Sequence, residues 1–220
     1  MADIHTRGPA ELRRAPLDHL REALASCSAQ APTQITLQEQ PFSTQIGLRA
    51  MPGTAAHRAL ADATGAGLPA QVGEVRGGPD GVGVLWLAPD EFLVVAPPDS
   101  HPLLAAALGA ALGDAPGQAV DLSANRTIIE VRGAQARSLL EKGVPADLHP
   151  RALPPGSAVA TTLSTVPVLL WRTELHSFRL MPRASFADYV ARWLLDAARE
   201  HRPASLSDHP EEVSCPATVG

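Results

Sequence analysis

The chain has 220 residues, of which 45% are hydrophobic and 19% charged, which is typical of one large or two small globular domains. Its net charge is −5 and its arginines are scattered beside a single lysine, Lys142, so we expect no nucleic-acid partner. Cys27 and Cys215 form no Cys-x-x-Cys motif, which favours a reducing compartment. No signal-peptide pattern and no run of about 18 apolar residues occurs, so we predict a cytoplasmic protein without a membrane partner.

The first part of the chain predicts an N-terminal extension, residues 1–33, and a first α+β subdomain, residues 34–115. The extension contains a short helix at 16–25. In the subdomain, hydrophobic periodicity predicts the order strand, strand, helix, strand, strand, helix, at 34–39, 43–50, 52–63, 84–87, 91–96 and 103–112. Gly65 ends the first of these helices, and the glycine-rich residues 65–83 predict a long surface loop.

The second part predicts a second α+β subdomain, residues 116–200, with the same kinds of element. Its strands are predicted at 119–123, 126–132, 158–163, 167–172 and 178–181. One helix follows Gly133 and ends at Gly143, and a second covers 186–197 after a start at Ser185. Residues 201–220 predict a disordered tail. The predicted fold class is α+β, with two small split-βαβ-like layers of antiparallel or mixed sheet and helices on one face.

A proline-rich connection places Asp147, His149 and Arg151 within five residues. An acid beside an imidazole has the composition of a catalytic dyad. The alternative, which we favour, is that Asp147 caps a turn while His149 and Arg151 tie the connection to a neighbouring element. None of the eight histidines pairs with another at the spacing of two metal ligands on one element, so no metal site is predicted.

Arg126 follows a polar turn, Asp121-Leu-Ser-Ala-Asn125, between two predicted strands. Its guanidinium suits bidentate binding of a carboxylate on a partner chain or, less favoured, on a ligand. An internal salt bridge to Asp121 is the alternative, and the sequence leaves the partner contact and the internal bridge open.

Trp171 and Arg172 end a strongly apolar strand. Such a tryptophan usually belongs to the core, but Trp and Arg are also enriched among interface anchors. Because functional contacts concentrate in turns and at strand ends, we predict five candidate subunit-interface residues: Arg126, His149, Arg151, Trp171 and Arg172. No dinucleotide, Walker, nucleophile-elbow or zinc-protease motif occurs, so we predict no catalytic or cofactor site in this chain.

Three blocks carry a family resemblance: Asn125-Arg126-Thr127, Asp147-Leu-His-Pro-Arg151 and Leu169-Leu-Trp-Arg172. Together they closely resemble the gamma subunits of heterotetrameric sarcosine oxidases, over roughly residues 16–200. A looser pattern, Asp-x-Ser followed by Val-x-Gly-x-x-Ala-x-x-Leu-Leu, resembles the folate-binding domain of the aminomethyltransferases.

The resemblance implies a non-catalytic subunit that supports assembly of an oxidase converting sarcosine to glycine, formaldehyde or methylene-tetrahydrofolate, and hydrogen peroxide. It implies an alpha subunit as the contacting partner, with beta and delta subunits in the same complex. FAD, FMN, NAD, zinc and tetrahydrofolate would belong to those partner subunits, and this chain would carry none. The alternative is a free-standing folate-binding protein of the aminomethyltransferase type.

Overall fold

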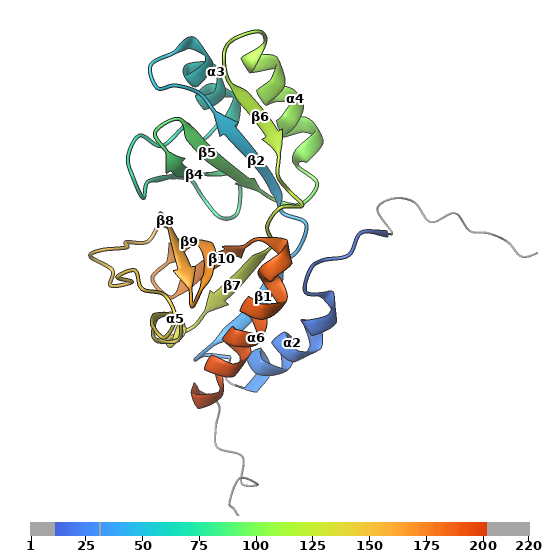
Figure 1. The fold of residues 1–220 in the computed structure, drawn as a ribbon, viewed down its shortest axis with the longest axis vertical. Helices are drawn as coiled ribbons and strands as arrows, with labels where there is room; N and C mark the ends of the chain where they lie inside the picture. Colours follow the sequence, from blue (N-terminus) through green and yellow to red (C-terminus); the bar gives the residue numbers. More distant parts are fainter. Residues whose placement is uncertain (1–11, 31, 202–220) are drawn as a thin grey trace, which may run out of the picture.

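The computed structural model describes residues 12–30 and 32–201, which form two five-stranded antiparallel sheets (Figure 1). The first sheet has the order β3-β4-β5-β2-β6, with bounds Val75–Gly77, Gly83–Ala88, Glu91–Ala96, Thr44–Arg49 and Gln118–Asp121. The second has the order β1-β7-β10-β9-β8, with bounds Thr36–Gln40, Ile128–Arg132, Ser177–Pro182, Val166–Glu174 and Ser157–Leu163. The predicted α+β class is confirmed, and the sheets are antiparallel.

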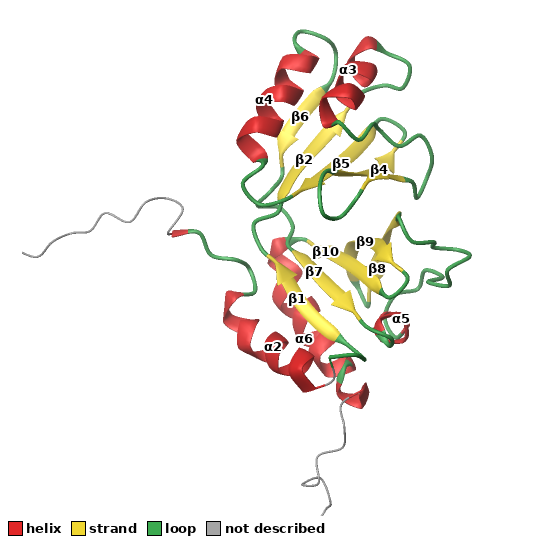
Figure 2. Ribbon diagram, turned by 180° about the vertical axis from the view of Figure 1, so that it is seen from behind, coloured by secondary structure: helices red, strands yellow, loops and turns green. Residues whose placement is uncertain are grey.

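The helices cover the outer faces of the two sheets (Figure 2). The first sheet carries α3, Ala55–Thr64, and α4, His101–Leu112. The second carries α2, Arg21–Gln30, α5, Ala136–Glu141, and α6, Ala187–Ala197. Short 3-10 helices are η1, η2 and η3, with bounds Asp18–Leu20, Ala184–Phe186 and Arg199–His201. None of the helices in the described part of the chain is long and apolar enough to cross a membrane.

Alternation along the strands produces three packed layers of apolar side chains. In β7, Ile129 and Val131 face the helices of the second sheet, whereas Ile128 faces the first sheet. The layer between the sheets also holds Leu93 and Trp171. Because both faces of the central strands are buried, each sheet has helices on one side and the other sheet on the opposite side.

The chain crosses between the two sheets twice, which the predicted subdomains 34–115 and 116–200 do not describe. β1 and β2 are consecutive, but β1 joins the second sheet beside β7, while β2 lies in the first. In the same way β6 pairs with β2, and β7 begins the next sheet. Each half therefore donates one edge strand to the other half's sheet. The alternation of apolar and polar residues predicts which face of a strand is buried. It does not predict which sheet edge the strand joins.

The predicted N-terminal extension is part of the second core. The helix lies at Arg21–Gln30 instead of 16–25, and Leu17, Leu20, Leu24 and Cys27 are all buried against the second sheet. The segment from Leu17 onward thus contributes apolar surface to the fold. The predicted disordered tail, 201–220, lies outside the described residues apart from His201.

The ends of α3 agree with the prediction, whereas the end of α5 does not. Thr54 caps α3 by accepting the His57 N–H, and Gly65 ends it at φ 68°, as predicted. Gly143 was predicted as a helix cap, but Lys142 occupies that position. A Cβ at Gly143 would meet Trp193 Cζ2 at 2.5 Å, so close packing explains this glycine.

Two further segments differ from the predicted elements. Residues 65–83 are not loop throughout, because they contain β3. The last helix begins at Ala187 after the η2 turn, with no capping bond from a side chain, so Ser185 does not start it.

Candidate functional site

The five candidate interface residues fall in three different surroundings. Arg126 lies in the second crossing between the sheets, and His149 and Arg151 lie on an exposed turn. Trp171 and Arg172 are each 1% exposed, on β9. The structure therefore does not bring the five together as one site.

The guanidinium of Arg172 is bound by backbone carbonyls inside the fold. Its Nη1 donates to the oxygens of Leu148 and Leu153 at 3.1 and 2.9 Å. Its Nη2 and Nε donate to the oxygens of Leu175 and Glu174 at 2.5 and 3.3 Å. Burial is the main cause that lowers the pKa of Arg172, although arginine stays charged at neutral pH. The side chain thus joins the connection at 144–156 to the tip of the β9–β10 hairpin.

Trp171 points the other way, into the layer between the two sheets. A Cβ at Gly83, on the first sheet, would lie 2.6 Å from its Cη2 atom. The guanidinium of Arg179 lies 5.4 Å from the centre of its ring. The expected acceptor for the indole N–H is not found among the described residues. Trp171 and Arg172 are internal to the fold, which removes both from the set of exposed interface candidates.

The turn that follows α5 has the structural role predicted for Asp147. The carboxylate of Asp147 accepts the N–H of His149 at 2.8 Å, and Nδ1 of His149 accepts the N–H of Arg151 at 3.2 Å. These bonds use the acid and the imidazole for local backbone structure, which argues against the catalytic dyad. The link to a neighbouring element, predicted for His149 and Arg151, is made instead by Arg172.

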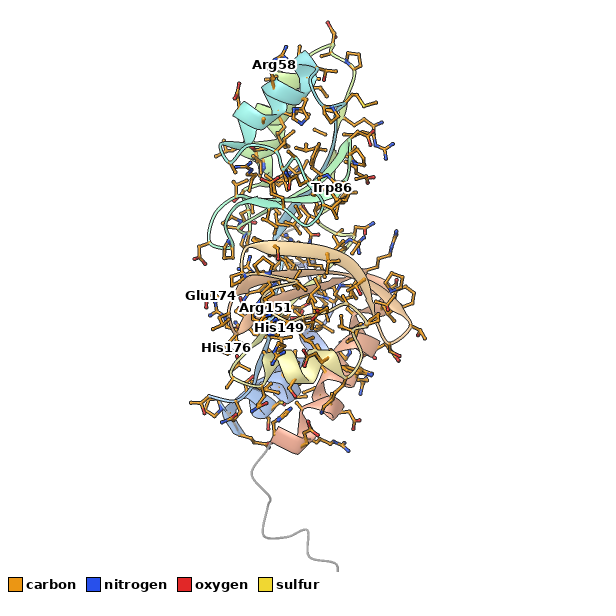
Figure 3. All side chains as sticks on the ribbon, turned by 90° about the vertical axis from the view of Figure 1, so that its left-hand side faces the viewer. Arg58, Trp86, His149, Arg151, Glu174 and His176 are labelled. Carbon is orange, nitrogen blue, oxygen red and sulfur yellow. The ribbon has the colours of Figure 1, made fainter. Side chains whose placement is uncertain are left out.

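His149 and Arg151 nevertheless share an exposed surface with the hairpin tip. Both side chains are exposed, and Leu175 at the tip is 50% exposed. Figure 3 shows them on the same side of the molecule as Glu174 and His176. We define the turn–hairpin surface as His149, Arg151, Glu174, Leu175 and His176. From inside the fold, the guanidinium of Arg172 binds both the turn and the hairpin tip. The two segments of this surface are therefore held in a fixed arrangement.

The second candidate surface is a cavity of about 370 Å³ at the two crossings, which we name the crossover pocket. Gln45 holds the crossings together: its N–H donates to Ser123 Oγ at 3.0 Å and its side-chain amide donates to the carbonyl of Arg126 at 2.9 Å. The pocket is lined by Arg13, Arg14, Pro16, Gln40, Phe42, Ser43, Gln45, Asp121, Ser123, Ala124, Arg126 and Thr127.

Arg126 does not form the internal salt bridge considered for it. Its Nη1 donates to the carbonyl of Met181 at 3.3 Å, and no described carboxylate lies within 4.0 Å. Burial, followed by the nearby charge of Arg183, lowers the pKa of Arg126. Asp121 instead accepts bonds from Ser123, and its Oδ2 lies 3.3 Å from His101 Nε2. These contacts outweigh the effect of burial and lower the pKa of Asp121.

A larger cavity of about 690 Å³ follows α2 and β1 and includes Glu39 and Glu130. Burial raises the pKa of Glu39, against the opposing effect of hydrogen bonds from Thr127 and the Leu17 N–H. Within 12–30 and 32–201, histidines, cysteines and acids form no group of three that could hold a metal ion.

Sequence comparison identifies relatives along most of the chain. The model described as "Sarcosine oxidase, gamma subunit family" matches residues 47–200. The sarcosine oxidase subunit gamma of Corynebacterium sp. (strain U-96) is 48% identical over 197 residues, 90% of this chain and 95% of that protein. The subunit gamma of Arthrobacter sp is 52% identical over 189 residues, 86% of this chain and 91% of that protein.

Structural comparison agrees with these relationships. A chain of the heterotetrameric sarcosine oxidase from Corynebacterium sp. U-96, solved in complex with pyrrole 2-carboxylate, superposes with a TM-score of 0.84 at 48% identity, covering 89% of this chain and 100% of that chain. The glycine cleavage system aminomethyltransferase T of Bartonella henselae shares the fold, with a TM-score of 0.57 at 18% identity, over 79% of this chain and 48% of that one. The chain therefore belongs to the sarcosine oxidase gamma subunit family.

Proposed function

We propose that this chain is the non-catalytic gamma subunit of a heterotetrameric sarcosine oxidase and acts in assembly of the complex. The observation that carries the proposal is the match to a chain of such an oxidase, with a TM-score of 0.84 over 100% of that chain. The alpha subunit is the proposed contact, with beta and delta subunits in the same complex, in the cytoplasm. The complex would oxidise sarcosine to glycine, formaldehyde and hydrogen peroxide, or pass the one-carbon unit to tetrahydrofolate.

The chemistry of the two candidate surfaces supports a binding role over a catalytic one. On the turn–hairpin surface, the imidazole of His149 accepts a backbone N–H, so this ring nitrogen is not free to act as a base. In the crossover pocket, the polar side chains of the lining are cations, hydroxyls and amides beside one engaged carboxylate. We propose that FAD, FMN, NAD, zinc and tetrahydrofolate are held by the partner subunits.

For the partner contact we retain Arg126, His149 and Arg151. All three are accessible, lie in turns or crossings, and belong to segments that partly or fully buried hydrogen bonds hold in place. Such preorganised surfaces lose little conformational entropy on binding. His149 and Arg151 would act through the turn–hairpin surface and Arg126 through the crossover pocket.

Affinity purification of the tagged full chain at native expression level tests the proposal. We expect three partner chains, a flavin absorbance band and sarcosine-dependent peroxide formation in the purified complex. The tagged chain purified alone should be colourless and form no peroxide. Recovery of the chain without partners, or flavin bound to the lone chain, would contradict the subunit role.

The free-standing aminomethyltransferase alternative rests on fold similarity only, at 18% identity and 48% of the length of that protein. Tetrahydrofolate binding separates the two functions. Titration of the lone chain with tetrahydrofolate should release no heat if the chain is an assembly subunit, whereas a stoichiometric binding curve would favour the folate-dependent alternative.

A further inference from the structure

The crossover pocket contains an arginine that lacks an anionic partner. Arg126 is half-buried, yet the only hydrogen bond that its guanidinium makes within the described residues is the 3.3 Å contact to the carbonyl of Met181. A guanidinium has five N–H donors, and buried charges are normally paired or fully hydrogen-bonded. Arg172 satisfies this rule with four carbonyls, whereas Arg126 does not.

The other charges around the pocket increase its positive character. Asp121 is engaged by Ser123 and His101, and Arg13 is paired with Asp99 at 3.1 Å. Arg14, on the pocket wall, and Arg183, whose backbone bridges to that of Arg126, form no salt bridge within the described residues. An uncompensated cluster of cations is unusual on a chain of net charge −5 and favours an anion from outside.

We propose that the crossover pocket receives a carboxylate from an acidic side chain of a partner subunit, bound by the fork of Arg126. This inference rests on the proposed assembly function and specifies its chemistry. A bidentate arginine–carboxylate pair is the geometry that guanidinium favours, and covering Arg126 without an anion would leave a buried charge unpaired.

The lining favours a protein side chain over a free small molecule. Small-ligand sites are predominantly apolar, commonly about 300–1,000 Å³ in volume. The crossover pocket, at about 370 Å³, is near the lower end of that range, and nine of its twelve lining residues are polar or charged, three of them arginines. Interface rims are polar and solvent-accessible, and arginine is enriched among interface anchors.

Charge removal in the assembled complex tests the inference. Arg126→Gln should at least halve the NaCl concentration that releases half of this chain from the complex, measured by size-exclusion chromatography. Arg58→Gln is the matched control: Arg58 is an exposed arginine on α3, away from the second sheet in Figure 3, and it has no salt bridge within the described residues. This control should assemble like the wild type, because only a contacted charge contributes a short-range, salt-screened attraction.

An arginine footprint tests the inference without any variant. Phenylglyoxal modification followed by peptide mass spectrometry should label Arg126 at least fivefold less in the complex than in the full chain alone, while Arg58 is labelled equally in both. Equal labelling of Arg126 in the two states, or unchanged salt release for Arg126→Gln, would overturn the partner carboxylate.

Two further outcomes separate the possible failures. If the wild-type chain does not co-purify with partners at all, the assembly function fails and the inference fails with it. If Arg126→Gln assembles normally while acetate, tested at constant ionic strength, raises the melting temperature of the wild type but not of the variant, the pocket binds small carboxylates and the partner contact is rejected.

Discussion

Arg126 and Arg172 show how two regions of one chain use the same side chain in opposite ways. In the turn–hairpin region, four backbone carbonyls surround Arg172, which is 1% exposed. In the crossover pocket, Arg126 meets one carbonyl and faces the charge of Arg183. The first arginine holds the fold together and the second remains available to a partner. The number of carbonyls that the local backbone offers, not the residue type, separates an internal clamp from a binding group.

The largest loss of stability is expected for Arg172→Met. This substitution keeps most of the side-chain volume but removes every hydrogen-bond donor. The buried carbonyls of Leu148 and Leu153 would then lose their partner, at about 1–3 kcal/mol for each unsatisfied group. We expect the free energy of unfolding to fall by about 4 kcal/mol, measured by urea denaturation of the full chain.

Arg137→Met is the matched control for that variant. Arg137 is a half-exposed arginine on α5, bound to Glu141 at 3.0 Å across one helical turn. Surface pairs of this kind contribute less than about 0.5 kcal/mol. If the two variants unfold at the same urea concentration, Arg172 is not the clamp that the geometry indicates.

A smaller effect is expected where the neighbouring Trp171 fills the space between the sheets. Gly83→Ala would place a Cβ 2.6 Å from the ring, so the ring or the strands around it must shift, at about 1–3 kcal/mol. Gly109→Ala is the control, because Gly109 lies in α4 with open space around it and alanine should add about 0.5–1 kcal/mol of stability. A lower melting temperature for Gly83→Ala and a higher one for Gly109→Ala would confirm the tight packing around Trp171. Equal changes in the two variants would contradict it.

The sequence predicted most element types and their order, but not the acceptors around Arg172. Carbonyls occur on every residue, so no residue type marks them. The one indirect signal is the four prolines at 145, 150, 154 and 155. They lack N–H groups and prevent regular pairing, so nearby carbonyls need a donor from another element. In the sequence, a Trp-Arg pair at a strand end is equally compatible with a core position and with an interface position.

The exchange of edge strands was also beyond sequence reasoning. In β1 only Leu37 is buried, so its alternation is weak and specifies no neighbour. The crossover pocket exists because of this exchange, since Gln40 and Phe42 of one crossing meet Ser123 and Arg126 of the other. The identity of Arg126 as a carboxylate-binding candidate could be inferred from the sequence, but the absence of an internal partner among the described residues required the fold.

Glu39 tests whether an acid close to the crossover pocket is electrostatically separate from Arg126. A carboxylate paired with arginine has a lowered pKa, whereas burial raises the pKa of Glu39. A raised pKa in the folded chain means that protonation of Glu39 stabilises the fold. The stabilising contribution is then complete below the ordinary glutamate value of about 4.3 and is lost as pH rises through the folded pKa.

Glu39→Gln should therefore stabilise the chain at pH 7 relative to pH 4, by less than about 1 kcal/mol because the group is partly exposed. Thermal unfolding of wild type and variant between pH 4 and 8 measures the difference. If the variant instead loses stability relative to the wild type as pH rises, Glu39 is paired with a cation. Arg21 is the cation whose charge acts on Glu39, and Arg126 is not among the charges that do.

The smallest change in stability is expected for Arg126→Gln. Arg126→Gln in the full chain alone removes one 3.3 Å bond to Met181, but it also removes a partly desolvated charge next to Arg183. These terms oppose each other, so the unfolding free energy should change by no more than about 0.5 kcal/mol, as for a surface substitution. Urea denaturation, run beside Arg172→Met, measures both arginines on one scale. A loss of about 2 kcal/mol or more would show that Arg126 is also structural, and the two regions would then differ in degree only.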